Sequence, residues 1–174
     1  GATDAVHASH RERDVVEHAL EVAHRALLGV HERGEREGRL RDGKTVHTFT
    51  LPEGSWAYQA VRKPNGHLLV AGGYNPTLFE LDAQGKTVKT IGGKESPEAQ
   101  ALGLHFFGAF QVLKSGDIVL ANWTGHGRDD GAKGVQLLQY NGAGKVVWKW
   151  HDPLRAGSIN GVLVLDDLDP AVLN

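Results

Sequence analysis

Apolar and polar residues alternate in short runs from Arg41 onward, and glycine-containing turns separate these runs. Alternation with a period of two indicates half-buried β-strands, and pairs such as Asn-Gly and Ser-Gly indicate tight hairpin turns. The pattern therefore predicts a mainly β region, with strands at 45–50, 57–63, 67–72, 77–82, 86–91, 108–113, 117–122, 135–140, 145–150 and 159–165.

One hairpin sequence of this region is present twice in full and once in part. LFELDAQGKTVKTI at 78–91 aligns with LLQYNGAGKVVWKW at 137–150, because the Gly-Lys pairs of the two turns coincide. RDGKTVHTF at 41–49 is a shorter copy of the same hairpin. Repetition at this length indicates supersecondary units that bury their apolar faces only against one another.

The hairpins that precede these copies repeat as well. VRKPNGHLLVAG at 61–72 aligns with QVLKSGDIVLAN at 111–122, so each unit holds four antiparallel strands. Units of this kind are typical of β-propeller blades. We therefore expect a partial β-propeller, with two complete blades at about 57–91 and 108–150 and a flanking strand on either side. A closed ring takes about four to eight blades, so the two outer blade faces need a further partner.

Residues 1–40 follow a helical pattern instead. Their apolar residues recur three and four positions apart, which is the spacing of an amphipathic helix: Val16, Leu20, Ala23, Leu27 and Val30. We expect an N-terminal amphipathic α-helix at about 4–35, packed on the β region or on a second copy of itself. The expected division is therefore a helical segment, 1–40, and a β-propeller part, 41–174.

Length, charge and cysteine content restrict the function classes. With 174 residues, the chain forms one domain with at most one appendage. Its formal net charge of -2 predicts no nucleic-acid partner, and no run approaches the roughly 18 apolar residues of a membrane span. Cysteine is absent, which excludes disulfides, thiolate catalysis and cysteine metal ligands.

The blade sequences resemble those of a known group. The segments 65–73 (NGHLLVAGG), 78–91, 115–123 (SGDIVLANW) and 135–152 (VQLLQYNGAGKVVWKWHD) are similar to blades of PQQ-like, quinoprotein-type β-propeller repeat proteins. The resemblance covers about residues 41–165. It implies a propeller fold and an exported protein, periplasmic or extracellular, because the group includes exported scaffold and assembly proteins, sensor-like extracellular proteins and quinone-dependent dehydrogenases. A two-blade chain offers no matching set of cofactor-clamping residues, so the resemblance assigns no catalytic residue and no cofactor.

The loops before the first strand of each blade supply a first group of candidate ligand-binding residues. In a propeller these loops gather near the axis at one end, where binding sites usually form. Trp56 and Tyr58 precede the first blade, His105 precedes the second, and Asn160 lies in the last expected strand. We expect these four residues to line an axial pocket. The alternative is that the aromatic rings pack between blades and that His105 binds backbone groups.

An insertion in the second blade supplies the other candidates. The second unit has nine additional residues within 123–134, and loops that break a repeat are free to acquire function. His126, Asp129 and Asp130 lie close together there, between glycines, and this combination favours a ligand or ion site. The alternative is a solvated loop whose polar side chains bind their own backbone. The spacing matches no zinc or calcium loop, so no metal site is assigned.

Trp148 and Trp150 end the second blade on one side of its last predicted strand. An aromatic pair in this position favours a contact with a neighbouring blade, and the alternative is a site for a sugar or another flat ligand.

Two functions from different classes remain at this point. The first is a non-enzymatic binding or scaffold module that presents loops to a protein or a small ligand. The alternative is a propeller enzyme, such as a quinone-dependent dehydrogenase or a metal-dependent hydrolase, of which this chain is only a part. An enzyme of that kind requires converging polar residues from at least three blades, so the binding module is preferred. The open blade faces predict either a homo-oligomer or the remaining portion of a parent chain as the partner that completes the ring.

Overall fold

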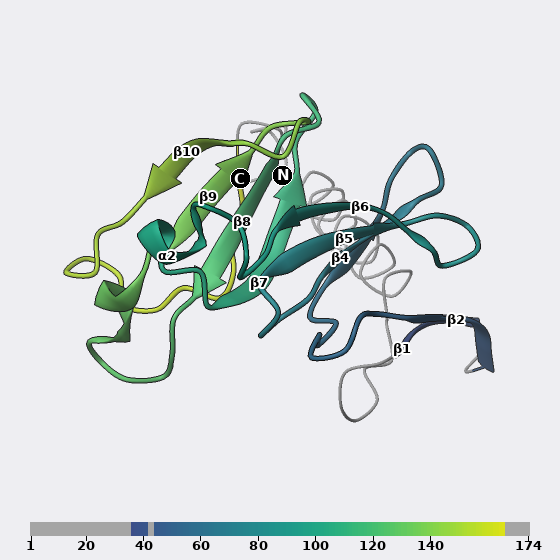
Figure 1. Cartoon of the computed structure of the whole chain (residues 1–174), viewed down its shortest axis with the longest axis horizontal. Coiled ribbons are helices and arrows are strands. Elements are labelled where there is room, and N and C mark those ends of the chain that lie inside the picture. The colour runs from purple at the N-terminus through teal and green to yellow at the C-terminus, as the bar shows by residue number, and fades with distance from the viewer. Residues whose placement is uncertain (1–35, 42–43, 166–174) are drawn as a thin grey trace, which may run out of the picture.

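The computed structural model describes residues 36–41 and 44–165. This part of the chain is mainly β and contains two four-stranded antiparallel sheets and one separate hairpin (Figure 1). The helix predicted at 4–35 lies outside the described residues.

The two four-stranded sheets have the same topology. The first has the order β3-β4-β5-β6 and the second the order β7-β8-β9-β10, so each strand pairs with its neighbours in sequence. The strands are Ala60–Arg62 (β3), Leu68–Ala71 (β4), Thr77–Leu81 (β5), Thr87–Gly92 (β6), Phe106–Val112 (β7), Ile118–Trp123 (β8), Leu137–Tyr140 (β9) and Val146–Trp150 (β10). The prediction of two four-stranded antiparallel units is therefore confirmed. Two short helical elements, α2 (Ala99–Leu102) and η1 (Asp130–Lys133), precede β7 and β9.

The separate hairpin joins β1 (Arg36–Arg41) to β2 (Lys44–Thr50). The strand predicted at 45–50 is confirmed by β2. The pattern gave no sign of β1, which begins inside the segment assigned to the helical part, because residues 36–40 become a strand only by pairing with β2.

The strand predicted at 159–165 is wrong, and the described residues do not close a ring. Residues 159–164 have no regular secondary structure, although Asn160 O accepts a hydrogen bond from Ala109 N of β7 at 2.9 Å. Because a strand needs a ladder of backbone partners, apolar alternation alone does not produce one.

The repeated turns depend on Asp82 and Asn141. In each case Oδ1 accepts hydrogen bonds from the N–H groups two and four residues further on, at 2.9 Å for Asp82 and 3.0 Å for Asn141. Gly85 and Gly144 follow with φ angles of 81° and 79°, a region that favours glycine. The shared pattern of Asp or Asn, two residues, Gly and Lys is therefore a local turn device.

Strand register divides each sheet into two faces, because residues paired across antiparallel strands point to the same side. The front face of the first sheet carries Ala60, Leu68, Val70, Phe79 and Leu81, and the equivalent front face of the second carries Phe110, Ile118, Leu120, Leu138 and Tyr140. The back face of the first sheet carries Val61, Leu69, Ala71, Leu78 and Ile91, and that of the second carries Gln111, Val119, Ala121, Leu137 and Trp150.

The main core forms where the back face of the first sheet packs on the front face of the second. A second core covers the front face of the first sheet, where Phe49 of β2 and the adjacent Leu51 pack on it. Each fully buried leucine of these cores contributes roughly 1.5–3 kcal/mol. Because the alternate residues of β4 and β5 face both cores, the first sheet is buried on both sides.

Glu80 is a buried carboxylate on the back face of the first sheet. Its Oε2 accepts a hydrogen bond from Lys63 Nζ at 2.9 Å, and its Oε1 lies 2.8 Å from Nδ1 of His67. Burial raises the pKa of the Glu80 carboxyl, but the bonds from Lys63 and His67 outweigh burial and leave the pKa below its usual value. The carboxylate therefore stabilises the fold when it is charged.

Glu80→Gln should lower the free energy of unfolding by about 1–3 kcal/mol at neutral pH, because it removes a bond between charged groups. The folded pKa lies below the unfolded value of about 4.5, so this stabilisation is present above that pH and is lost as the pH falls further. The variant should therefore lose less stability in acid than the parent. Urea unfolding at several pH values checks this, with the exposed Glu95→Gln as control, and parallel pH profiles for all three proteins would contradict it.

Candidate functional site

Loops from both sheets meet at one end of the molecule. β3 begins and β4 ends at this end of the first sheet, and β7 begins and β8 ends at the corresponding end of the second. The two sheets are joined there by a bridge, in which Phe107 N donates to Gly73 O at 3.0 Å. The residues that flank these four strands therefore lie side by side.

Seven ring side chains from these segments contact one another, and we call them the aromatic cluster: Trp56, Tyr58, Tyr74, His105, Phe106, Trp123 and His126. Phe106 is the buried centre, and its ring centroid lies 4.8 Å from that of Tyr74, 5.2 Å from that of Tyr58 and 5.4 Å from that of Trp123. These three contacts are edge to face, the geometry that adds about 0.5–1.5 kcal/mol per pair beyond area burial. The cluster is therefore held in a defined arrangement.

Three rings of the aromatic cluster present apolar surface to solvent. Trp56 is 50% exposed, Tyr58 46% and Tyr74 39%. Trp56 and Tyr74 touch at a centroid distance of 5.4 Å, so the exposed area is continuous. A continuous exposed apolar patch on a rigid sheet end marks an interaction surface, whereas single exposed apolar residues carry no such meaning.

Asn122 positions the part of the cluster that belongs to the second sheet. Its fully buried side chain accepts hydrogen bonds from the N–H groups of His105, at 2.9 Å, and Phe106, at 3.3 Å. It donates to the carbonyl oxygens of Gly103, at 3.0 Å, and Val135, at 2.8 Å. One amide therefore ties β8, the segment before β7 and the segment before β9 together.

The insertion within 123–134 is organised around Asp130. Its carboxylate accepts a hydrogen bond from Gly127 N at 3.0 Å and forms an ion pair with Lys133 Nζ at 2.7 Å. The bonds from Lys133 and Gly127 hold the pKa of Asp130 below its usual value. The folded loop places His126 on Trp123, with the ring centroids 4.6 Å apart. Asp130 thus acts on the loop backbone, as the solvated-loop alternative expects.

His105 combines a ring contact with a polar one. Its Nδ1 lies 3.2 Å from the carbonyl oxygen of Trp123, and because a carbonyl only accepts, Nδ1 is the donor. In the neutral ring Nε2 is then an acceptor, so the exposed edge of the aromatic cluster carries a hydrogen-bonding group.

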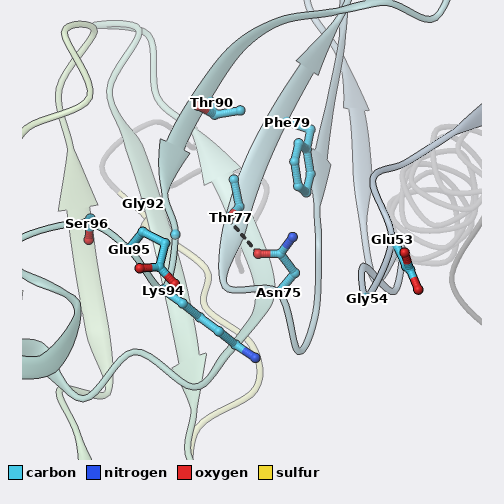
Figure 2. A pocket seen from close by; sticks show the side chains of 11 residues that line it. Glu53, Gly54, Asn75, Thr77, Phe79, Thr90, Gly92, Lys94, Glu95 and Ser96 are labelled. Carbon is cyan, nitrogen blue, oxygen red and sulfur yellow. Dashed lines mark hydrogen bonds between the residues drawn. The ribbon is translucent and has the colours of Figure 1, made fainter.

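A polar hollow adjoins the aromatic cluster at the end of the first sheet. It has a volume of about 450 Å³ and is open to solvent (Figure 2). Asn75, which lines the hollow, connects the two features. Its Nδ2 donates a hydrogen bond to Ser55 Oγ at 3.1 Å. Tyr74 precedes Asn75 in the sequence, Trp56 follows Ser55, and both rings belong to the aromatic cluster. Thr77 Oγ1 donates to Asn75 Oδ1 at 2.9 Å, as the dashed line in Figure 2 shows. The hollow is also lined by charged side chains, namely Glu53, Lys94 and Glu95.

The structure brings together part of the residue set that the sequence predicted. Trp56, Tyr58, His105 and His126 all belong to the aromatic cluster, although the sequence divided them between two sites. Asp129 is exposed and immediately precedes η1. Asn160 supplies its backbone oxygen to β7 at Ala109.

Three members of the aromatic cluster were absent from the predicted set: Tyr74, Phe106 and Trp123. Tyr74 follows the second strand of its unit and Trp123 ends the second strand of the other, and in an antiparallel unit that point adjoins the start of the first strand. This chain-order signal was available in the sequence. The partnership of Phe106 with Tyr58 across the two sheets depends on the packing of the sheets and carried no local signal.

Comparison with known proteins supports the fold alone. No family model matches the chain, and no curated protein sequence matches it. A crystal structure at 1.35 Å resolution of a protein of unknown function from Bacteroides caccae is similar, with a TM-score of 0.60 and 23% sequence identity. The match covers 73% of this chain and 46% of the other, so the chain spans less than half the length of that protein. The likeness assigns no family.

Two further properties concern the described residues only. Within residues 36–41 and 44–165, no group of three or more His, Cys, Asp or Glu side chains is arranged to hold a metal ion. No helix in this described part has the length and apolar character needed to cross a membrane.

Asn122→Ala should lower the free energy of unfolding by about 2–4 kcal/mol, because it leaves buried backbone donors and acceptors without partners. Gln84→Ala is the control, since the Gln84 side chain is exposed and its removal should cost less than about 1 kcal/mol. Urea unfolding measures both values. Near-ultraviolet circular dichroism reports the order of the aromatic rings, and an unchanged spectrum for Asn122→Ala would contradict the positioning role.

Proposed function

We propose that this chain is a non-enzymatic binding module built from two blades of β-propeller type, and that it binds its ligand on the aromatic cluster. The observation that carries the proposal is the continuous, half-exposed surface of Trp56 and Tyr74, to which the half-exposed Tyr58 is linked through Phe106. Exposing these rings forgoes roughly 25 cal/mol for each Å² of apolar area left in water, so a ligand that covers them gains that free energy.

The chemistry around the cluster favours a carbohydrate as the ligand. A pyranose ring has apolar C–H faces that stack on aromatic rings and a rim of hydroxyl groups that both donate and accept hydrogen bonds. The exposed rings fit the first property. The adjoining hollow offers the amide of Asn75, the carboxylates of Glu53 and Glu95 and the ammonium of Lys94, which fit the second.

The arrangement suits a chain of sugar residues better than a single one. Asn75 lines the hollow and is bonded to Ser55, and these two residues are next in sequence to two rings of the aromatic cluster, Tyr74 and Trp56. A sugar stacked on Trp56 would therefore place its neighbour over the hollow. Sites of this composition, mostly aromatic with a few placed polar groups, are typical of small-ligand recognition.

Titration with defined oligosaccharides tests the proposal. Hexasaccharides with α-glucose, β-glucose, β-xylose and N-acetylglucosamine units serve as probes, and calorimetry and tryptophan fluorescence follow binding. We expect at least one probe to bind and Trp56→Ala or Tyr74→Ala to weaken it by about tenfold, the loss expected for one stacking contact. Trp148→Ala is the matched control, because Trp148 is 45% exposed on a different surface, and should leave the affinity unchanged.

The outcomes distinguish the parts of the proposal. Absence of binding for all four probes would refute the carbohydrate class. Binding that Trp148→Ala weakens as much as Trp56→Ala would refute the location on the aromatic cluster. Chromatography of the probes after long incubation detects turnover, and shortened sugars would refute the non-enzymatic role.

A further inference from the structure

The contact between the two sheets repeats a contact made by the separate hairpin. When the three copies of the turn are aligned on Gly-Lys, Phe49, Ile91 and Trp150 occupy the same position in β2, β6 and β10. The Phe49 ring lies against the turn of the first sheet, where a Cβ on Gly85 would come within 2.5 Å of it. Ile91 lies against the next turn in the same way, 3.4 Å from the position of a Cβ on Gly144.

Two glutamine side chains also link each unit to the segment that follows it. Nε2 of Gln59 donates to Phe110 O at 2.9 Å, and Phe110 N donates to Gln59 Oε1 at 2.8 Å. Gln111 of β7 makes the same pair of bonds to Val164, at 3.2 and 2.8 Å. Each unit thus holds the backbone of the following one, and the second unit already holds the segment that follows it.

Trp150, the third residue of this aligned set, has no equivalent contact with the turn of a further sheet within the described residues. Trp150 is partly exposed on the back face of the second sheet, and Trp148, on the same face, is 45% exposed. Leu137 and Gln139 lie opposite them in β9 and are also partly exposed. On the first sheet, this face is the one buried in the main core.

The chain itself carries the surface that fits this face. The front face of the first sheet is equivalent, position by position, to the front face of the second, which receives a back face in the main core. The front face of the first sheet is covered by Phe49 of the β1–β2 hairpin and by Leu51, which follows the hairpin. By the turn alignment this hairpin corresponds to β5–β6 and β9–β10, the outer half of a complete four-stranded sheet.

We infer that the back face of the second sheet is a docking surface for a second copy of this chain. It packs on the front face of the copy's first sheet, where β9–β10 replaces the β1–β2 hairpin and β8 extends the contact. Beside β7, the first strand of the copy's first sheet takes the place that the segment bonded to Gln111 holds in the single chain. Trp150 then meets Gly85 of the copy, as Phe49 does in the single chain. Two copies related in this way supply four sheets, the lower end of the range for closed propellers, and leave no face open.

The hairpin and the second copy compete for one surface, so substitutions have opposite effects. Trp150→Glu places a charge in the new contact and should weaken dimerisation at least tenfold. Phe49→Ala loosens the hairpin and should strengthen dimerisation at least tenfold. Lys149→Glu is the matched control, because Lys149 is exposed and lies between the two tryptophans in β10 but on the opposite, front face of the sheet. It should leave the dimerisation constant unchanged.

Sedimentation velocity of the full chain measures the mass from about 1 to about 500 µM, a range wide enough to resolve a concentration-dependent equilibrium. Far-ultraviolet circular dichroism verifies that each variant is folded, and Trp148→Glu repeats the test if Trp150→Glu is not. A monomer–dimer equilibrium that shifts in the expected directions supports the inference. A wild-type chain that is monomeric throughout overturns it, as does a dimer that neither tryptophan substitution weakens. A dimer that Phe49→Ala does not strengthen overturns the replacement of the hairpin.

Discussion

The packing of the back face of the first sheet on the front face of the second is the interaction on which the rest of this structure depends. It buries the apolar residues of β4 and β5 on one side and those of β8 and β9 on the other. It also fixes the relative position of the two loop ends, because the bridge from Gly73 to Phe107 lies at the edge of the same contact. Without this packing the rings of the aromatic cluster, which come from both sheets, would not meet.

The buried hydrogen bonds of Asn122 fix the loop conformations that the apolar packing of the sheets leaves open. Sheet packing is non-directional and leaves the loops free to choose among several conformations. Asn122 of β8 removes this freedom, since its buried amide satisfies four backbone groups from two other segments. Such a network is costly if one partner is lost and therefore specifies a single arrangement. The half-exposed ring of Tyr74 contacts Phe106 and Trp123, which lie beside this network.

Much of the fold could be predicted from the sequence, and the reasons for the failures are physical. The turns at Gly85 and Gly144 were predicted because their hydrogen bonds are local, made by a side chain at the start of each turn. Residues 159–165 end in an apolar run like those of true strands, yet they lack a strand partner, which the sequence of one segment cannot reveal. The ring residues nearest the strand starts were found, whereas Tyr74 and Trp123 were missed because their position depends on which strand ends share an edge. The ligand site predicted at Asp130 stays a prediction, and the bonds of its carboxylate to Gly127 and Lys133 depend on the folded loop and carried no sequence signal.

The fold arises from the similarity of the two units, and the candidate site arises from their differences. Gly73 in the first unit takes the position of Trp123 in the second when the strands are aligned. A side chain at Gly73 would come within 2.7 Å of the Trp56 carbonyl oxygen, so the first unit has no room for a ring at the position where the second supplies one. The insertion that follows Trp123 adds His126 to the same edge. The divergence at these positions therefore separates the residues that maintain the sheets from those available to bind a ligand.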